Sequence, residues 1–431
     1  MYRLLNLEYM KMLINLTPLI YVYHTEHTSV LKYLIFMRYT LPTSHFASTP
    51  RLLTTGHSHT HTINSSTSTM SSQHTSKIFI IGGTGAQGIP VITSLVADKK
   101  YSVRVLTRDS KSQRAKALLA LGNVELVEGT FADETDLRNG YRECDGAFVN
   151  IDGFNCGEKN ETYWAIRAYE LAVEEGIKFF VYGNLDYSLK KGGYDPKYRT
   201  GHYDGKGRIG EWIFFQNTHN KARMGAALFT TGPYIEMTIS SRTIMTPTVE
   251  NDIVTWRVPL GTGSVNHVAL DDCGPYVRWL FDHPERASGM DLEVAIAPIP
   301  YADLAAAFTK VTGHPAQYID TSLEDYWNQP GNKFLADSPA GYNADPNDKS
   351  TMSFRDNFTG FWNTWKHDLL KRDYKLLDEI HPTRIRSAEE WFRREDEKGR
   401  EKGLGGLWDR VQKDNLVPVL KVGEDLRRGK L

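Results

Sequence analysis

Short, mainly apolar runs alternate with amphipathic segments between residues 77 and 182. Five such runs, each of five or six residues, predict buried strands at 77–81, 102–107, 123–128, 146–150 and 178–182. Apolar residues recur at helical spacing between them, in the segments 89–96, 112–121, 136–141 and 160–176. Strands that alternate with helices predict an α/β fold, namely a Rossmann-type doubly wound parallel sheet. We expect a smaller α/β C-terminal subdomain to accompany this sheet.

The first apolar run leads directly into a glycine-rich segment with the sequence GGTGAQG. Its glycines have the spacing Gly82-x-x-Gly85-x-x-Gly88, and a helical pattern starts at the next residue. Such glycines allow a tight turn and a close approach of a pyrophosphate, which the amides at the helix start then face. The segment therefore predicts a dinucleotide site, to which we assign Gly82, Thr84, Gly85, Ala86, Gln87 and Gly88.

The residues at the end of the second apolar run indicate whether the cofactor is NAD or NADP. An acidic side chain at this place binds the ribose hydroxyls of NAD, whereas an arginine accommodates the 2′-phosphate of NADP. Arg108 follows the run and favours NADP; in the alternative interpretation Asp109 turns inward and Arg108 is a solvated surface charge. Asn150 closes the fourth run, and because ligands lie at the carboxyl ends of such strands, we also assign it to the cofactor site.

Two segments after the fifth run have the spacing of the Tyr-x-x-x-Lys pair that short-chain dehydrogenases carry. That spacing places both side chains on one helix face, where the lysine holds the nicotinamide ribose and the tyrosine delivers a proton. Tyr187 and Lys191 match literally, but two glycines follow at once and end the helix. In the segment HYDGK, His202 stands where the tyrosine would be and Lys206 keeps the lysine position. We predict Lys206 and His202 as catalytic residues; the alternatives are a solvent-facing lysine and a loop histidine.

The glycine spacing, Arg108 and the HYDGK segment, in this order, resemble the NmrA-like family of atypical short-chain dehydrogenases of the fungal type. The segments 232–237 and 269–285 are similar to a later loop and helix of that family, so the resemblance covers roughly residues 76–323. It implies a Rossmann domain with a smaller substrate or partner domain and a preference for NADP. One branch of the family restrains a transcription factor, and other members are oxidoreductases of secondary metabolism.

Carried over to this chain, the resemblance implies that the three glycines hold the pyrophosphate and Arg108 the 2′-phosphate. Lys206 would approach the nicotinamide ribose. The chain departs from the family's pattern at Gly129-Thr130, where an aspartate commonly follows the glycine. Adenine contacts at that place are therefore not carried over.

Composition and charge limit the partners. The chain is 40% apolar and 24% charged, which is typical of a globular protein and excludes a wholly disordered chain. A formal net charge of −1 supplies no basic field for nucleic acid, and no apolar run is long enough to span a membrane. Three scattered cysteines form neither a disulfide framework nor a zinc pattern, so we expect no metal. The expected partners are NADP(H), a small-molecule substrate and a transcription factor.

The chain divides into three predicted parts. Residues 1–75 hold half of the 14 histidines and are poor in acidic residues, which indicates a disordered leader, a transit peptide or a mis-assigned start. Residues 76–325 form the NADP-binding part with elements of a substrate subdomain. Residues 326–431 form a helical extension with a lid, and its aromatic residues at 354–365 serve as core packing or as a pocket wall. We expect a cytoplasmic or nuclear protein, or a mitochondrial one if the leader is a transit peptide.

Two functions remain open at this point. The first is an NADP(H)-binding redox sensor or transcriptional co-regulator that acts through a protein partner. It is favoured because the tyrosine is replaced by His202 and no serine directly follows the fifth run, while the glycine loop is intact. The alternative is an NADPH-dependent oxidoreductase that reduces a small aromatic or secondary-metabolite carbonyl or enone. Lys206 or His202 would then donate the proton or orient the carbonyl, as a histidine can near neutral pH.

Overall fold

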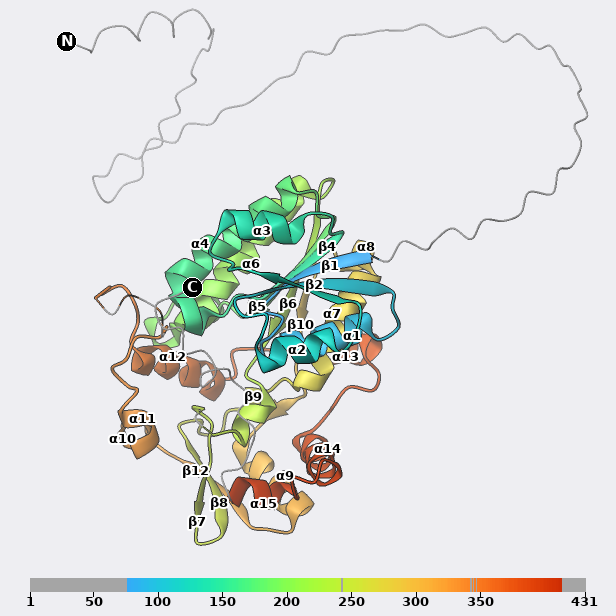
Figure 1. Cartoon of the computed structure of the whole chain (residues 1–431). Coiled ribbons are helices and arrows are strands. Elements are labelled where there is room, and N and C mark those ends of the chain that lie inside the picture. The colour runs from blue at the N-terminus through green and yellow to red at the C-terminus, as the bar shows by residue number, and fades with distance from the viewer. Residues whose placement is uncertain (1–75, 242, 342, 344, 346, 413–431) are drawn as a thin grey trace, which may run out of the picture. The chain divides into compact units, whose positions relative to one another are not determined.

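The computed structural model describes residues 76–412 except 242, 342, 344 and 346 (Figure 1). The expectations for residues 1–75 and for the end of the chain after 412 lie outside the described residues. The central sheet consists of β1 (Ser76–Ile81), β2 (Tyr101–Thr107), β3 (Val124–Glu128), β4 (Gly146–Val149), β5 (Phe179–Leu185), β6 (Gly225–Thr231) and β10 (Asp291–Glu293). All of its neighbouring strands are parallel, in the order β10-β6-β5-β4-β1-β2-β3. The chain reverses its direction of travel across the sheet between β1 and β4, where such folds bind ligands.

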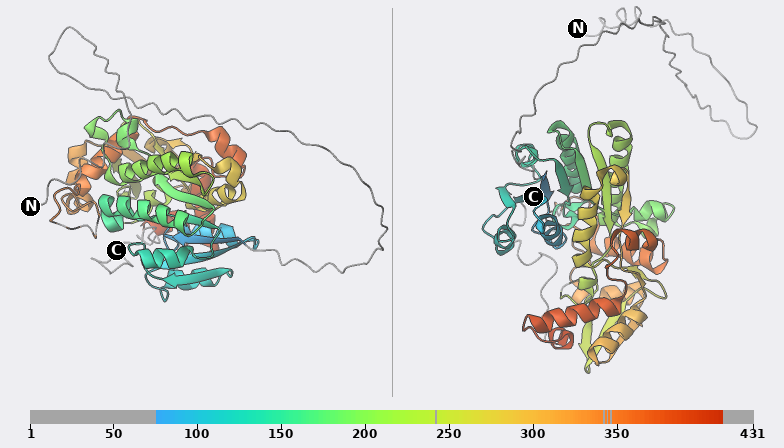
Figure 2. Two further views of the ribbon diagram at one scale, coloured as in Figure 1. Left: turned by 90° about the horizontal axis from the view of Figure 1, so that it is seen from above. Right: turned by 90° about the vertical axis from the view of Figure 1, so that its right-hand side faces the viewer.

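Helices cover both faces of the sheet (Figures 1 and 2). They are α1 (Gly88–Val96), α2 (Gln113–Leu119), α3 (Glu134–Tyr141), α4 (Gly153–Glu174), α6 (Gly201–Asn220) and α7 (Leu270–Asp282). Successive side chains of a strand point to opposite faces. Ile78 and Ile80 therefore pack with α1 and α7, whereas Phe79 and Ile81 pack with α3, α4 and α6. Burial on both faces explains why these strands read as apolar runs, and the predicted doubly wound α/β fold is confirmed.

The start of α4 differs from the expectation of a helix over 160–176. The helix begins at Gly153, where the carboxylate of Asp152 accepts the backbone N–H groups of Phe154 and Asn155 at 3.0 and 3.3 Å. Gly157 interrupts it with φ 77° and ψ 159°, a backbone conformation that essentially only glycine adopts. The added first turn contains mixed polar and small residues without helical periodicity, which is why the sequence pattern did not indicate it.

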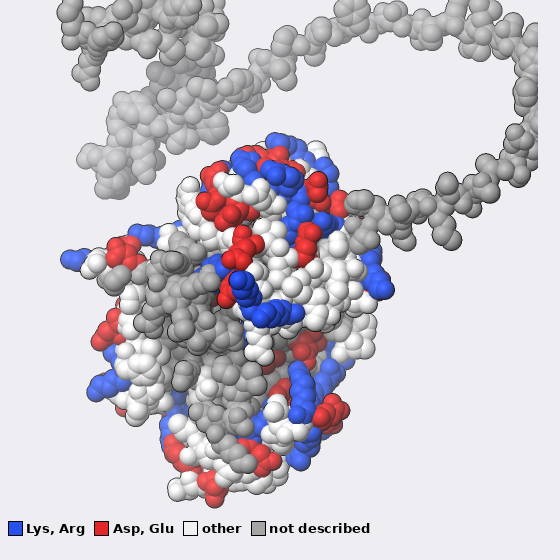
Figure 3. All heavy atoms as spheres, in the orientation of Figure 1, with Lys and Arg blue, Asp and Glu red and all other residues white. Residues whose placement is uncertain are grey.

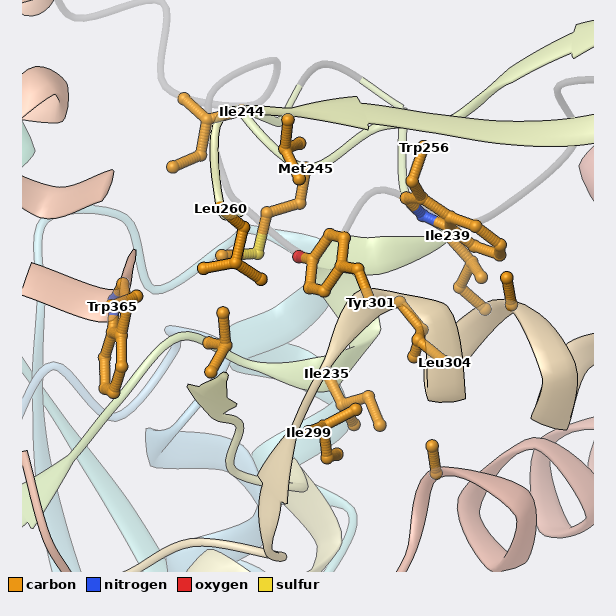
Figure 4. Close-up of a cluster of buried hydrophobic side chains, with 14 of the residues drawn as sticks. Ile235, Ile239, Ile244, Met245, Trp256, Leu260, Ile299, Tyr301, Leu304 and Trp365 are labelled. Atoms are coloured by element: carbon orange, nitrogen blue, oxygen red, sulfur yellow. The ribbon is translucent and has the colours of Figure 1, made fainter. Parts of the chain in front are cut away.

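A smaller α/β subdomain surrounds a second core. It contains β7 (Thr248–Glu250), β8 (Ile253–Val258), β9 (Val265–Asn266), β11 (Pro298–Ile299), α9 (Tyr301–Thr312) and β12 (Ala316–Asp320). The three-stranded sheet β12-β8-β7 and the two-stranded sheet β11-β9 frame this core. Figure 4 shows Tyr301 and Leu304 of α9 together with Trp256 of β8 and Trp365, and all four are buried. Trp256 also donates its indole N–H to the carbonyl of Thr238 at 2.8 Å.

The remaining helices are short or belong to the C-terminal part. They are α5 (Ser188–Lys191), η1 (Pro196–Tyr198), η2 (Ile235–Thr238), α8 (Pro284–Ala287), α10 (Leu323–Asn328), α11 (Pro330–Lys333), α12 (Phe354–Lys366), α13 (Tyr374–Ile380), α14 (Ala388–Glu401) and α15 (Leu407–Gln412). The predicted boundary after residue 325 falls inside α10. Aromatic side chains of α12 and α14, among them Trp362 and Trp391, belong to the same core as β8 and α9.

An ion pair joins the C-terminal part to the central sheet. Arg372, between α12 and α13, binds both carboxylate oxygens of Asp186 at 2.7 and 3.0 Å. Asp186 directly follows β5, and neither side chain is exposed. Lys191 reaches the same carboxylate at 2.7 Å from the other side. The C-terminal part is therefore held at the carboxyl end of β5, close to where the fold binds ligands.

The described surface carries charges of both signs. On the face in Figure 3, lysines and arginines are interspersed with aspartates and glutamates. No helix within the described range is both long enough and apolar enough to cross a membrane. The three cysteines, Cys144, Cys156 and Cys273, are free and buried.

Candidate functional site

The glycine loop joins β1 to α1 through a tight turn that leaves no room for a side chain at Gly82 and Gly88. Gly82 has φ 82°, and a Cβ on it would lie 2.3 Å from the carbonyl oxygen of Asn150. A Cβ on Gly88 would lie 2.3 Å from the carbonyl oxygen of Gly82, and Gly85 donates its N–H to that oxygen at 3.0 Å. Both positions therefore require glycine, and the tight turn leads directly into the start of α1.

The side chain of Gln87 links this loop to the ends of neighbouring strands. It is buried, and its Oε1 accepts the Nδ2–H of Asn150 at 2.7 Å. Its Nε2 donates to the hydroxyl of Thr231 at 3.4 Å. The structure thus brings the predicted residues Gln87 and Asn150 together between β4 and β6.

Two arginines lie on the side of the loop that faces β2. Arg108 directly follows β2 and is half-buried. Arg114, the second residue of α2, donates to the carbonyl of Thr84 in the loop at 3.4 Å. Asp109 is exposed, and its carboxylate accepts the backbone N–H of Lys111 at 2.9 Å, so it does not turn inward as the alternative interpretation required.

Lys206 is buried at the carboxyl ends of the central strands, so it is not a solvent-facing lysine. Its Nζ donates to the carbonyls of Ile151 at 2.8 Å and Gly183 at 3.0 Å, and to the Oδ1 of Asn150 at 3.2 Å. A carboxylate oxygen of Glu161 lies 2.9 Å from the same Nζ. A continuous polar chain therefore runs from Gln87 through Asn150 and Lys206 to Glu161.

Glu161 is the residue of this site that the sequence reasoning missed. It lies on α4, its side chain is completely buried, and burial raises the pKa of its carboxyl although Lys206 opposes the shift. A signal was present in the helical pattern: Glu161 lies four and seven residues before the buried Ala165 and Ala168. It therefore belongs to the apolar stripe of α4, where an ionisable residue needs a partner.

His202 lies one turn before Lys206 on α6, in an aromatic enclosure. Its ring is 4.6 Å from that of Phe154 and 5.2 Å from that of Phe358, and the two phenylalanines stack with an interplanar angle of 3°. The Oδ1 of Asn357 lies 3.0 Å from the Nδ1 of His202 and also accepts its backbone N–H at 3.3 Å. Burial lowers the pKa of His202 to about 4. The imidazole is therefore neutral, with the proton on Nδ1 directed at Asn357.

Tyr187 and Lys191, the literal Tyr-x-x-x-Lys match, do not belong to the site around Lys206. Only Ser188–Lys191 is helical there, as a single turn named α5. Lys191 binds the carboxylates of Asp186 at 2.7 Å and Glu293 at 2.6 Å. This lysine is engaged in the ion-pair network that holds the C-terminal part. Among the described residues, no group of three or more His, Cys, Asp or Glu side chains is arranged to hold a metal ion.

The NmrA-like family model matches residues 74–336, more than half of the chain. The chain belongs to the NmrA-like family. Its relatives include the NmrA-like family domain-containing oxidoreductase himF of Aspergillus japonicus, 27% identical over 57% of this chain and 76% of that protein. The NmrA-like family domain-containing oxidoreductase FrzB of a Cladobotryum species is 26% identical over 56% of this chain and 75% of that protein.

Solved structures share the NmrA-like fold. NmrA, a negative transcriptional regulator solved in complex with NAD, has a TM-score of 0.59 at 16% identity, covering 78% of this chain and 99% of its own. The NADPH-dependent quinone oxidoreductase QOR2 of Escherichia coli, complexed with NADPH, has a TM-score of 0.56 at 18% identity, covering 73% and 98%. At such identities the likeness concerns the fold. Asn357 and Phe358, which enclose His202, lie beyond the residues matched by the NmrA-like family model.

Proposed function

We propose that this protein binds a nicotinamide dinucleotide and works as an NADP(H)-dependent oxidoreductase on a small carbonyl or enone compound. The observation that carries the proposal is the burial of Lys206 at the carboxyl ends of β4 and β5. Ligands of a doubly wound sheet bind at these ends, beside the switch point between β1 and β4. The names of relatives such as himF and FrzB, both oxidoreductases, support the same class of reaction.

The residues present fit a dinucleotide. The tight turn at Gly82 and Gly88, where a Cβ would meet backbone oxygens, is the kind of turn that lets a pyrophosphate approach the backbone closely. Arg108 would bind the 2′-phosphate of NADP, and the guanidinium of Arg114, which reaches the loop at Thr84, adds positive charge on the same side. The complexes of NmrA with NAD and of QOR2 with NADPH support a cofactor of this class in the fold.

Each side chain of the site has a separate task in this proposal. A bound dihydronicotinamide supplies a hydride. Lys206 would hold the nicotinamide ribose and donate one ammonium proton to the substrate oxygen as negative charge develops there, and the neutral amine left behind would take a proton back from water. Hydride and proton together reduce a carbonyl to an alcohol. His202 is neutral and directs its Nδ1–H at Asn357, so it shapes the apolar wall with Phe154 and Phe358 and donates no proton.

A second candidate function is a redox sensor or transcriptional co-regulator that binds NADP(H) and signals to a protein partner, such as a transcription factor. The specific observation in its favour is that the place of the usual tyrosine holds a histidine enclosed by aromatic rings. Such a site would bind the dinucleotide without turnover. The fold likeness to NmrA, a negative transcriptional regulator, is consistent with this role.

Calorimetric titration with NADPH, NADP⁺, NADH and NAD⁺, followed by NADPH oxidation assays with ketones, enones and quinones, separates the two functions. The oxidoreductase proposal expects turnover of at least one compound class, lost in Lys206→Met and retained in the control Lys178→Met, whose side chain is exposed. Tight, redox-selective binding without turnover across the panel supports the sensor. A wild-type protein that binds none of the four dinucleotides refutes both.

A further inference from the structure

The ammonium of Lys206 has more oxygen neighbours than protons to donate. Three N–H groups face four oxygens, of which three are neutral and belong to Asn150, Ile151 and Gly183. The fourth belongs to Glu161, the one anion within ion-pair distance of Lys206 in the described part of the chain. The neutral oxygens fix the place of the ammonium at the strand ends, and the carboxylate compensates its charge.

The structure assigns Glu161 as the positioning residue and counter-ion of Lys206. This inference rests on the proposed function, because it gives Lys206 its contact with the dinucleotide. Glu161 itself lies behind the lysine on α4 and acts only through it. When a ribose hydroxyl enters, Lys206 can exchange one of its three neutral oxygen partners for it and keep Glu161, since the carboxylate holds the ammonium as an ion pair.

The break in α4 creates the buried position that the Glu161 carboxylate occupies. Gly153 and Glu161 are eight residues apart, which is about 12 Å along an unbroken α-helix. Yet a Cβ on Gly153 would lie 2.3 Å from the Oε2 of Glu161. The glycine-only conformation of Gly157 folds the first turn of α4 back over the carboxylate. A Cβ on Gly205, one residue before Lys206, would lie 3.6 Å from the same oxygen. The backbone of α6 therefore also borders the position of the carboxylate.

Other charged and titratable groups around the pair come from three elements. Asp152 and Cys156 face it from the start of α4, and the carboxylate of Asp152 caps that helix. The ring of Tyr182 on β5 lies 5.3 Å from the Nζ of Lys206, and the neutral His202 lies on α6. Glu158 is paired with arginines at 199 and 208. Burial also raises the pKa of the Asp152 carboxyl, so both acids titrate near Lys206, but Glu161 is the one in contact with its Nζ.

The burial of Glu161 is expected to make the affinity for the dinucleotide depend on pH. Because burial raises the pKa of the Glu161 carboxyl above its usual range, the carboxylate becomes neutral at a higher pH than an exposed glutamate does as the pH falls. Neutralised Glu161 no longer anchors Lys206, so dinucleotide affinity falls in the wild type. Glu161→Gln imitates the neutral form at every pH and therefore loses the part of this pH dependence that comes from Glu161.

The test measures the NADPH dissociation constant by calorimetry between about pH 5 and about pH 9. At neutral pH we expect Glu161→Gln to bind roughly tenfold more weakly, the loss of one charge-assisted contact. The two affinities converge as the pH falls. Gly153→Ala, which displaces the carboxylate, is expected to weaken binding in the same direction, and the half-exposed control Glu170→Gln, which pairs with Arg167 on the same helix, behaves as the wild type.

The outcomes separate this inference from the proposed function. A wild type that binds no dinucleotide at any pH overturns the proposed function and this role with it. A wild type that binds, with Glu161→Gln following the same pH profile at the same affinity, overturns the role of Glu161 alone. Should Glu161→Gln not fold, Glu161→Gln combined with Lys206→Met restores the fold if the two residues are a pair, and failure of that rescue also counts against the inference.

Discussion

Removing the guanidinium of Arg372 tests whether the C-terminal part is an integral piece of the fold. Arg372→Met keeps much of the side-chain volume but deletes two hydrogen bonds, of 2.7 and 3.0 Å, to the completely buried Asp186. Leaving one member of a buried ion pair alone costs about 3–5 kcal/mol. Lys191 still reaches that carboxylate at 2.7 Å, so we expect the lower end, a loss of about 3 kcal/mol in the free energy of unfolding.

Urea denaturation, followed by circular dichroism and tryptophan fluorescence, measures this loss. The control is Arg386→Met, since Arg386 is exposed and its pair with Asp378 is expected to contribute less than about 1 kcal/mol. Arg372 and Lys191 hold the pKa of Asp186 below its usual value, so their contribution is present at neutral pH and is lost as the pH falls. Arg372→Met should therefore flatten the acid side of the stability profile. A variant within about 1 kcal/mol of the wild type would refute the reasoning.

Three further predictions concern the site itself. Arg108→Ala should weaken NADPH binding roughly tenfold or more and leave NADH binding unchanged, with Arg142→Ala as an exposed control; equal affinities in calorimetry would contradict the assignment. Gly82→Ala should abolish dinucleotide binding and lower stability by about 1–3 kcal/mol, because its φ is 82° and the new Cβ meets the backbone of Asn150; urea denaturation checks this. His202, with a pKa of about 4 against an ordinary 6.5, should stay neutral above about pH 5 in NMR titration and contribute stability that is lost as the pH falls from 6.5 toward 4; an imidazole that titrates near neutrality would be inconsistent with its enclosure.

Local patterns identified most of the central sheet. Each of the five predicted strands is present with ends within three residues, because an apolar run bounded by polar residues is a local property of a doubly buried strand. The last two strands, β6 and β10, were not among the predicted elements. The start of α4 was also missed, since Gly157 interrupts the helical periodicity that would have indicated it.

The amino-acid sequence by itself determined the glycine loop, the place of Arg108 at the end of β2 and the position of Lys206 on α6, because each depends on spacing within one strand, turn or helix. Only the tertiary structure decided the partners of these residues. Glu161 meets Lys206 from another helix, Asn357 meets His202 across 155 positions, and Arg372 meets Asp186 across 186. A buried charge or imidazole takes its chemistry from such neighbours, since burial removes the water that would otherwise define it. Residue types and local spacing do not specify which distant segments will supply them.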